Sequence, residues 1–116
     1  MRHPCVVNGE RYVSVVLRLY RATPTVLGHV RQADRALAKR LYDQRIPLYA
    51  VRNALILGAA RRVLHNGFST PMPPVRSLSY FVPILREILD RPPGHREIAE
   101  LIDQTRAQGV DWGAGW

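Results

Sequence analysis

The sequence predicts an all-α domain, a small bundle of four to five helices. The chain has 116 residues, enough for one domain with its own core. Apolar residues make up 47% of the chain and recur at helical spacing in several segments separated by proline or glycine. Only one segment also fits a strand, and a lone strand without a partner is not stable.

The first apolar segment is residues 12–20, and the eleven residues before it are expected to form a loose leader (1–11). One apolar set in this segment alternates as in a strand and comprises Val13, Val15, Leu17 and Leu19. Another set lies on one face of a helix and comprises Val13, Val16, Leu17 and Tyr20. Because no second strand exists to pair with it, a helix is favoured.

Thr23-Pro24 marks a boundary at which a helix can begin, since threonine is a good N-cap and proline fits the first turn. The next helix is expected from Gln32 to Gln44. Its apolar face comprises Ala33, Leu37, Ala38 and Leu41. Its other faces carry Arg35, Lys39 and Arg40.

The most apolar helix is expected from Leu48 to Leu64, between Pro47 and the stop signal Asn66-Gly67. A first apolar stripe comprises Leu48, Val51, Leu55, Ala59 and Val63. A second stripe widens it with Ile56, Ala60 and Leu64. A helix that is apolar over so much of its surface is expected at the centre of the bundle.

Residues 68–76 are predicted to form a rigid connector, because three of four consecutive residues in it are prolines. Ser77 or Ser79 caps the next helix, which runs to Asp90 with Pro83 near its first turn. A last helix is expected from His95 to Gln108, followed by a flexible, glycine-rich tail (109–116).

The positive charge is confined to one half of the chain. Residues 1–62 contain twelve Lys/Arg and three Asp/Glu, whereas residues 63–116 contain five and six. Sixteen of the seventeen basic residues are arginine, whose planar guanidinium matches phosphate. A GC-rich genome is the alternative cause of the arginine excess, but it does not explain why the charge lies in one half. Nucleic acid is therefore the predicted partner. Of the two nucleic acids, DNA is expected more than RNA.

The predicted contacts with nucleic acid comprise Arg35, Lys39, Arg40, Arg45, Arg52, Arg61, Arg62 and Tyr80. Arg61 and Arg62, with Arg45 and Arg52, form either a phosphate patch or a solvated helix end. Segments 32–44 and 48–64 also have the outline of a helix-turn-helix. The second of these helices would offer Tyr49, Arg52 and Asn53 to bases, or the two helices form a plain packing unit.

Aromatic residues raise two further alternatives. Tyr80 begins one stripe of its helix and Phe81 begins the next, so both are predicted core with one ring partly exposed. An exposed ring beside arginines binds single strands by stacking. Trp112 and Trp116 in the tail either dock back onto the domain or anchor a partner protein.

The sequence argues against an enzyme, a metal site or a bound cofactor. The four histidines lie outside ligand spacing of one another and of Cys5, and no phosphate-binding loop or nucleophile elbow is present. A single cysteine fits a reducing compartment. No apolar run approaches the length of a membrane span and no secretory signal begins the chain, so a cytoplasmic location without membrane contact is expected.

The order of features from Leu48 to Leu89 resembles the DnaD-like domain of bacterial and phage primosome proteins. That family combines a helix rich in alanine and aliphatic residues, a linker, and a short helix with the pattern Tyr-x-x-x-Ile-x-x-x-Trp. Tyr80 and Ile84 match the pattern, whereas Ile88 replaces the tryptophan and Pro83 is unusual there. The resemblance covers about a third of the chain and implies that Tyr80 lies near DNA in a protein of replication initiation.

Two classes of function follow as hypotheses. The first is a small, basic nucleic-acid-binding accessory protein of DNA replication or of a mobile element. A variant of it is a small subunit of a larger ribonucleoprotein complex, such as a CRISPR effector. The second is a protein–protein adaptor whose basic half meets an acidic partner while its tryptophan tail docks another.

Overall fold

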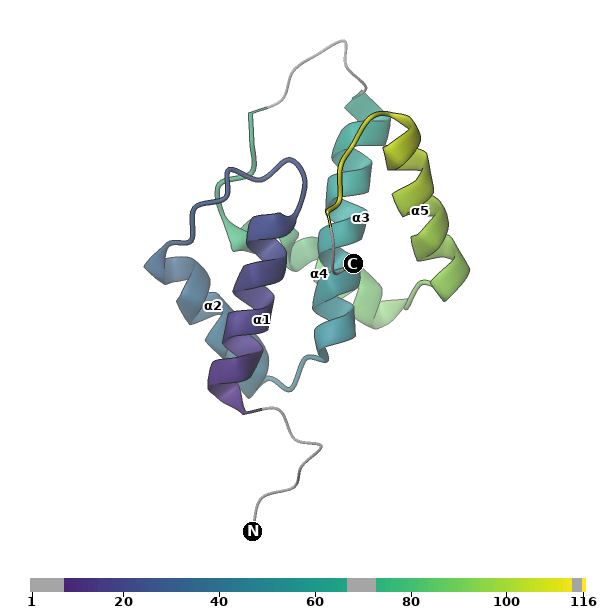
Figure 1. Ribbon diagram of the computed structural model, residues 1–116. Coiled ribbons are helices and arrows are strands. Elements are labelled where there is room, and N and C mark those ends of the chain that lie inside the picture. The colour runs from purple at the N-terminus through teal and green to yellow at the C-terminus, as the bar shows by residue number, and fades with distance from the viewer. Residues whose placement is uncertain (1–7, 67–72, 114–115) are drawn as a thin grey trace.

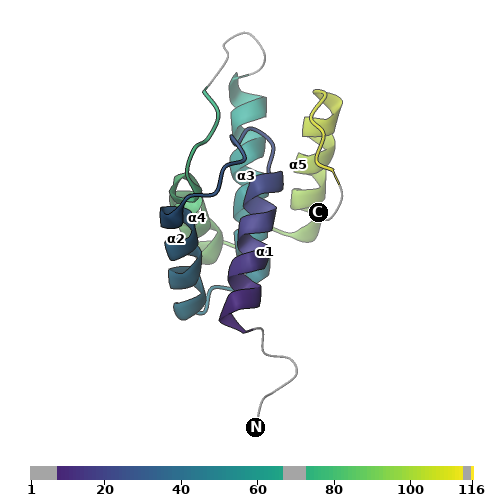
Figure 2. The same cartoon turned by 60° about the vertical axis from the view of Figure 1, so that its left-hand side comes forward.

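Five α-helices and one short 3-10 helix make up the fold in the computed structural model, which describes residues 8–66, 73–113 and 116. The elements are α1 (Gly9–Ala22), α2 (Gln32–Asp43), α3 (Leu48–Asn66), η1 (Leu78–Phe81), α4 (Val82–Asp90) and α5 (His95–Ala107). The all-α prediction is confirmed: in the described ranges the β structure is limited to one isolated bridge. Helix α3 lies in the middle, with α1 and α2 on one side and α5 on the other (Figures 1 and 2).

Helix α1 confirms the helical interpretation of residues 12–20. Its buried face comprises Tyr12, Val13, Val16, Leu17 and Tyr20. The last three residues of the predicted leader belong to the helix, because Asn8 caps it by accepting the N–H of Arg11 at 2.8 Å, and residues 1–7 lie outside the described residues. Tyr12 then anchors the helix: its hydroxyl donates to the carbonyl of Ile46 at 2.7 Å, and burial raises the pKa of Tyr12 to about 12.

No helix begins at Thr23-Pro24, because Thr23 ends α1 instead. Its N–H bonds the carbonyl of Tyr20 and its hydroxyl bonds the carbonyl of Leu19 at 2.7 Å. The chain then turns at Thr25 and Gly28, both with positive φ. This turn also binds the end of the predicted connector, since the N–H of Leu27 donates to the carbonyl of Val75 and the N–H of Val75 donates to that of Thr25, both at 2.8 Å. Residues 68–72 of the connector lie outside the described residues.

Helix α2 buries a carboxylate where an alanine was expected. Ala33 is exposed, whereas Asp34 is only 1% exposed. The Asp34 side chain accepts the backbone N–H of Arg31 at 2.9 Å and that of Leu78 at 2.9 Å. One acidic group thus joins the first turn of α2 to the start of η1.

Asp34→Ala is expected to lower the free energy of unfolding by about 2–3 kcal/mol, because it leaves the buried N–H of Leu78 without its acceptor. Urea denaturation followed by circular dichroism measures the change. Asp43→Ala, at an exposed position in the same helix, is the matched control and should change stability by less than about 0.5 kcal/mol. Equal effects of the two changes would contradict the role assigned to Asp34.

Helix α3 is the central element, as its apolar composition predicts, and it contacts a separate apolar cluster on each side. Leu55 belongs to the larger cluster with residues of α1, α2 and α4. The smaller cluster consists of Ile56, Ala59, Ile98, Ile102 and Trp112. Gly58 allows the aromatic ring of Phe81 to approach, since a Cβ there would lie 2.6 Å from two ring carbons.

The C-terminal helices follow the predicted boundaries closely. Ser77 is the cap of η1, accepting the N–H of Ser79, and Pro83 lies in the first turn of α4. Helix α5 ends one residue before the predicted boundary and packs mainly on α3. None of the helices in the described residues is long and apolar enough to cross a membrane.

Candidate nucleic-acid interface

Two shallow hollows adjoin along α2 and the turn that follows it. The first, of about 690 Å³, lies between the start of α1 and the side chains of Arg35 and Lys39. The second, of about 830 Å³, lies at the turn into α3 and includes Arg45 and Tyr49. Tyr42 and Asp43 line both hollows, so the two form one continuous surface. We call this surface the α2 track.

The local sequence explains why this end of α2 presents both charge and rings. Arg45 has a φ of 61° and turns the chain after α2, and its exposed side chain borders the second hollow. Tyr42 packs against the buried Tyr12, with ring centroids 5.4 Å apart. Tyr49, in the first turn of α3, is 63% exposed. Half-buried and exposed rings therefore alternate with cations.

The cations of the α2 track form no ion pairs with the described part of the protein. Arg35, Lys39 and Arg45 are exposed, and none of them forms an ion pair with a described residue. Two acidic residues, Glu10 and Asp43, also line the track and are exposed, so the three cations exceed them by one charge. Arg40, another predicted contact, is exposed on α2 but lines neither hollow.

Arg61 and Arg62 lie at the far end of α3 and already bind protein groups. Arg61 makes a two-bond ion pair with Glu87 of α4, at 2.9 and 2.8 Å. Hydrogen bonds from Arg61 lower the pKa of Glu87, and the same bonds raise the pKa of Arg61. Arg62 donates to the carbonyl of Pro73, and its guanidinium lies 5.5 Å from the ring centroid of Tyr80.

The four arginines of the predicted phosphate patch are therefore spread out. Arg45 precedes α3, Arg52 lies in its second turn, and Arg61 follows nine residues later, about 14 Å further along the axis. Arg52 is half-buried and faces α5, so it does not extend the α2 track. The structure brings together Arg35, Lys39 and Arg45 but separates them from Arg61 and Arg62.

Tyr80 is the partly exposed ring of the predicted aromatic pair. It is 41% exposed, whereas Phe81 is 3% exposed and fills the core beside Gly58. The two rings meet edge to face, with centroids 5.2 Å apart. Tyr80 with Arg62 thus forms a second, smaller place at which a base can stack.

The arrangement of α2 and α3 does not favour a helix-turn-helix. Helix α2 packs mainly on α1. Arg52 and Asn53, which would have to reach bases, are half-buried: Arg52 donates to the side-chain oxygen of Asn53 at 3.3 Å and to the backbone carbonyl of Trp116. Nor do α2 and α3 form a plain two-helix packing unit, because α2 packs mainly on α1 and α3 packs mainly on α4 and α5.

The two tryptophans dock back onto the domain, so the described part of the predicted flexible tail is packed. Trp112 is 2% exposed, and its indole N–H donates to the hydroxyl of Thr105 at 2.7 Å. Trp116 is half-buried, with its ring edge to face against Trp112 at 5.2 Å. Composition had suggested a mobile tail, but the burial of an indole outweighs the chain entropy of its glycines.

Sequence reasoning missed Tyr42 and the buried Asp34, and it considered Tyr49 only as a base reader in a groove. The available signal was the order Arg35, Lys39, Tyr42, Arg45, Tyr49, in which basic and aromatic residues follow at short spacing. In the described residues no group of three or more histidine, cysteine or acidic side chains is placed to hold a metal ion. Cys5 lies outside the described residues.

Comparison with known proteins finds no relative of this chain. No family model matches the chain, and the searches of curated proteins and of solved structures give no significant match.

Proposed function

We propose that the protein is a small nucleic-acid-binding accessory protein that holds a single strand along the α2 track. The observation that carries the proposal is the set of three exposed cations without ion pairs in the described structure, Arg35, Lys39 and Arg45, interleaved with the rings of Tyr42 and Tyr49. Cations bind the phosphates and rings stack on bases without sequence preference.

The shape of the surface supports a single strand over a duplex. A duplex reader inserts a helix or a ribbon into a groove, and the exposed side of α2 offers a shallow hollow on either side of Tyr42 instead. Unstacked bases can reach a half-buried ring such as Tyr42 or an exposed ring such as Tyr49. On the DnaD-like pattern at Tyr80 and Ile84, we extend the proposal to DNA in replication or in a mobile element.

Reversing Arg35 and Lys39 to glutamate is expected to weaken binding of a fluorescent oligo(dT) and to flatten its salt dependence. Each lost phosphate contact lowers the log–log salt slope by about 0.7 for single strands, so the double variant should lose about 1.4. Fluorescence anisotropy over a salt series measures both quantities. Oligo(rU) and a duplex of the same length, titrated in parallel, test the preference for single-stranded DNA.

The matched control reverses two other exposed arginines, Arg86 of α4 and Arg96 of α5. This variant has the same net charge as Arg35→Glu with Lys39→Glu, so it removes the same long-range attraction. A salt slope that falls equally in both variants would refute the α2 track and leave only the overall charge as the cause of binding.

Tyr49→Ala is expected to weaken oligo(dT) binding by about 1–3 kcal/mol through loss of stacking. Because the ring is 63% exposed, the thermal midpoint should remain near that of the wild type. Tyr80→Ala, which removes the other partly exposed ring, gives the comparison. If Tyr80→Ala lost affinity while Tyr49→Ala bound normally, the single strand would bind at Tyr80 and Arg62 and not along the α2 track.

A further inference from the structure

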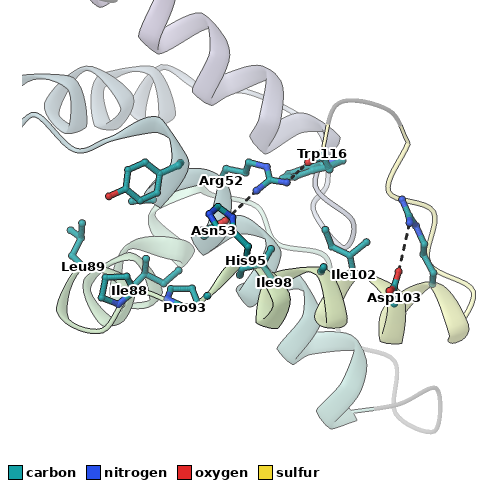
Figure 3. Close-up of a pocket in the computed structure, with 16 residues that line it drawn as sticks. Arg52, Asn53, Ile88, Leu89, Pro93, His95, Ile98, Ile102, Asp103 and Trp116 are labelled. Atoms are coloured by element: carbon teal, nitrogen blue, oxygen red, sulfur yellow. Dashed lines mark hydrogen bonds and ion pairs between the residues drawn. The ribbon is translucent and has the colours of Figure 1, made fainter.

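A groove of about 520 Å³ lies on the other side of Tyr49, between the start of α3, the end of α4 and the inner face of α5 (Figure 3). Its apolar lining comprises Ile88, Leu89, Pro92, Pro93, Ile98 and Ile102. Tyr49 and Trp116 line it as well, so aromatic rings join the aliphatic surface. The exposed lining is divided almost equally between apolar and polar groups, so the groove offers an apolar side chain and a polar group neighbouring sites.

The polar groups of the groove are mainly donors. Arg52 comes from α3 and His95 from the first turn of α5, and both line the groove (Figure 3). The available acceptors are already engaged, since the side-chain oxygen of Asn53 accepts from Arg52 and Asp103 pairs with Arg106 at 3.9 Å. The lining therefore complements a group that accepts hydrogen bonds and carries negative charge.

The protein's own Trp116 illustrates the chemistry that this groove accepts. Its indole packs against Trp112, and its backbone carbonyl accepts a hydrogen bond from Arg52. An aromatic side chain and a carbonyl oxygen of the peptide backbone are thus held together at one border of the groove. Leu89 and Tyr49 also line the groove and are 44% and 63% exposed, so two large apolar side chains face solvent at one site.

We propose that this groove binds a short segment of a partner protein in which an aromatic or leucine side chain lies next to an acidic residue. The apolar side chain contacts Leu89 and Ile98 on the aliphatic surface. The carboxylate accepts from the donors of Arg52 and His95. This site makes the protein an adaptor, and it does not depend on the binding of nucleic acid to the α2 track.

Nucleic acid fits this groove less well than an acidic peptide does. The groove is lined by two cationic side chains, Arg52 and Arg106, which suits a single carboxylate better than a run of phosphates. The exposed acidic residues Glu97 and Glu100 also lie on α5 and repel a phosphate backbone. A peptide carries its negative charge at one side chain and its apolar surface at the next, which matches the lining.

The test is a selection of random short peptides displayed on phage against the full chain, with the Leu89→Asp variant used for counter-selection. Leu89 is largely exposed, so this variant should keep the fold, which circular dichroism verifies. The enriched peptides should combine an acidic residue with a neighbouring aromatic or leucine residue. Synthesised with a fluorophore, the strongest peptide should bind Leu89→Asp at least about tenfold more weakly than wild type.

Two matched controls accompany the peptide. Leu27→Asp changes another leucine of similar exposure, 41%, that does not line the groove, and should leave peptide affinity unchanged. Replacing the acidic residue of the peptide by its amide should weaken binding to the wild-type protein. The same replacement should hardly change the affinity for the double variant His95→Ala with Arg52→Ala, because that variant lacks the donors.

Three outcomes would overturn the proposal. One is failure of the selection to enrich any peptide that distinguishes wild type from Leu89→Asp. Another is equal affinity of the acidic and amide peptides, which would remove the charged half of the recognition. A third is weaker oligo(dT) binding by Leu89→Asp with no effect on peptides, which would assign the groove to nucleic acid. The double variant Arg35→Glu with Lys39→Glu should bind the peptide normally. That result would support the groove as a peptide site even if the α2 track does not bind nucleic acid.

Discussion

Leu55→Ala is expected to lower the free energy of unfolding by about 2–5 kcal/mol. Leu55 is fully buried in the middle of α3, where it lies near Leu41 of α2, Phe81 and Leu85. The change loses the transfer free energy of the removed atoms and leaves a cavity, because the close-packed side chains around Leu55 relax only partly into the gap. Urea denaturation followed by circular dichroism gives the free energy.

Leu64→Ala, in the same helix but at an exposed position, is the matched control for Leu55→Ala. Both changes remove the same atoms and have the same effect on helix propensity, so the difference between them isolates burial. The control should change stability by less than about 0.5 kcal/mol. A similarly small effect of Leu55→Ala would mean that the core lies elsewhere.

Trp112→Ala is expected to cost about 3–5 kcal/mol. The indole is one of five buried side chains in the described cluster between α3 and α5, so its loss removes a large part of that cluster. The hydroxyl of Thr105 also loses its donor, although it keeps its own bond to the carbonyl of Ile102 at 2.9 Å. Thermal unfolding and urea denaturation should both report the loss.

Trp112→Phe separates packing from hydrogen bonding. It keeps an aromatic ring between α3 and α5 but removes the N–H that donates to Thr105, which should account for about 1 kcal/mol of the loss. The remainder measures packing. Near-normal stability of Trp112→Ala would show that the tail does not dock in solution and would restore the prediction of a flexible tail.

Helix boundaries were predictable because local residues determine them. Pro47 precedes α3, Ser77 caps η1, and Pro83 fits the first turn of α4 without loss of a hydrogen bond. Where prediction failed, the same residue had two local uses. Thr23 can cap the start of one helix or end another. It ends α1, because its hydroxyl donates to the carbonyl of Leu19.

Contacts between residues far apart in the chain could not be predicted from the sequence. The burial of Asp34 depends on the N–H of Leu78, which lies 44 residues away, and the engagement of Arg61 depends on Glu87, 26 residues away. No periodicity within one helix reveals either partner. The cations of α2 were predictable because they lie opposite its apolar face, but the place of Tyr42 between two hollows requires the packing of α1 on α2.

The position of Tyr49 has a regulatory consequence. Tyr49 lines both the second hollow of the α2 track and the groove beside α5, so one side chain borders both surfaces for which we propose a ligand. A peptide in the groove that covers this ring removes it from the strand, and a base stacked on the ring narrows the groove. The two ligands would then be linked by negative cooperativity, with the same coupling free energy in either order of addition.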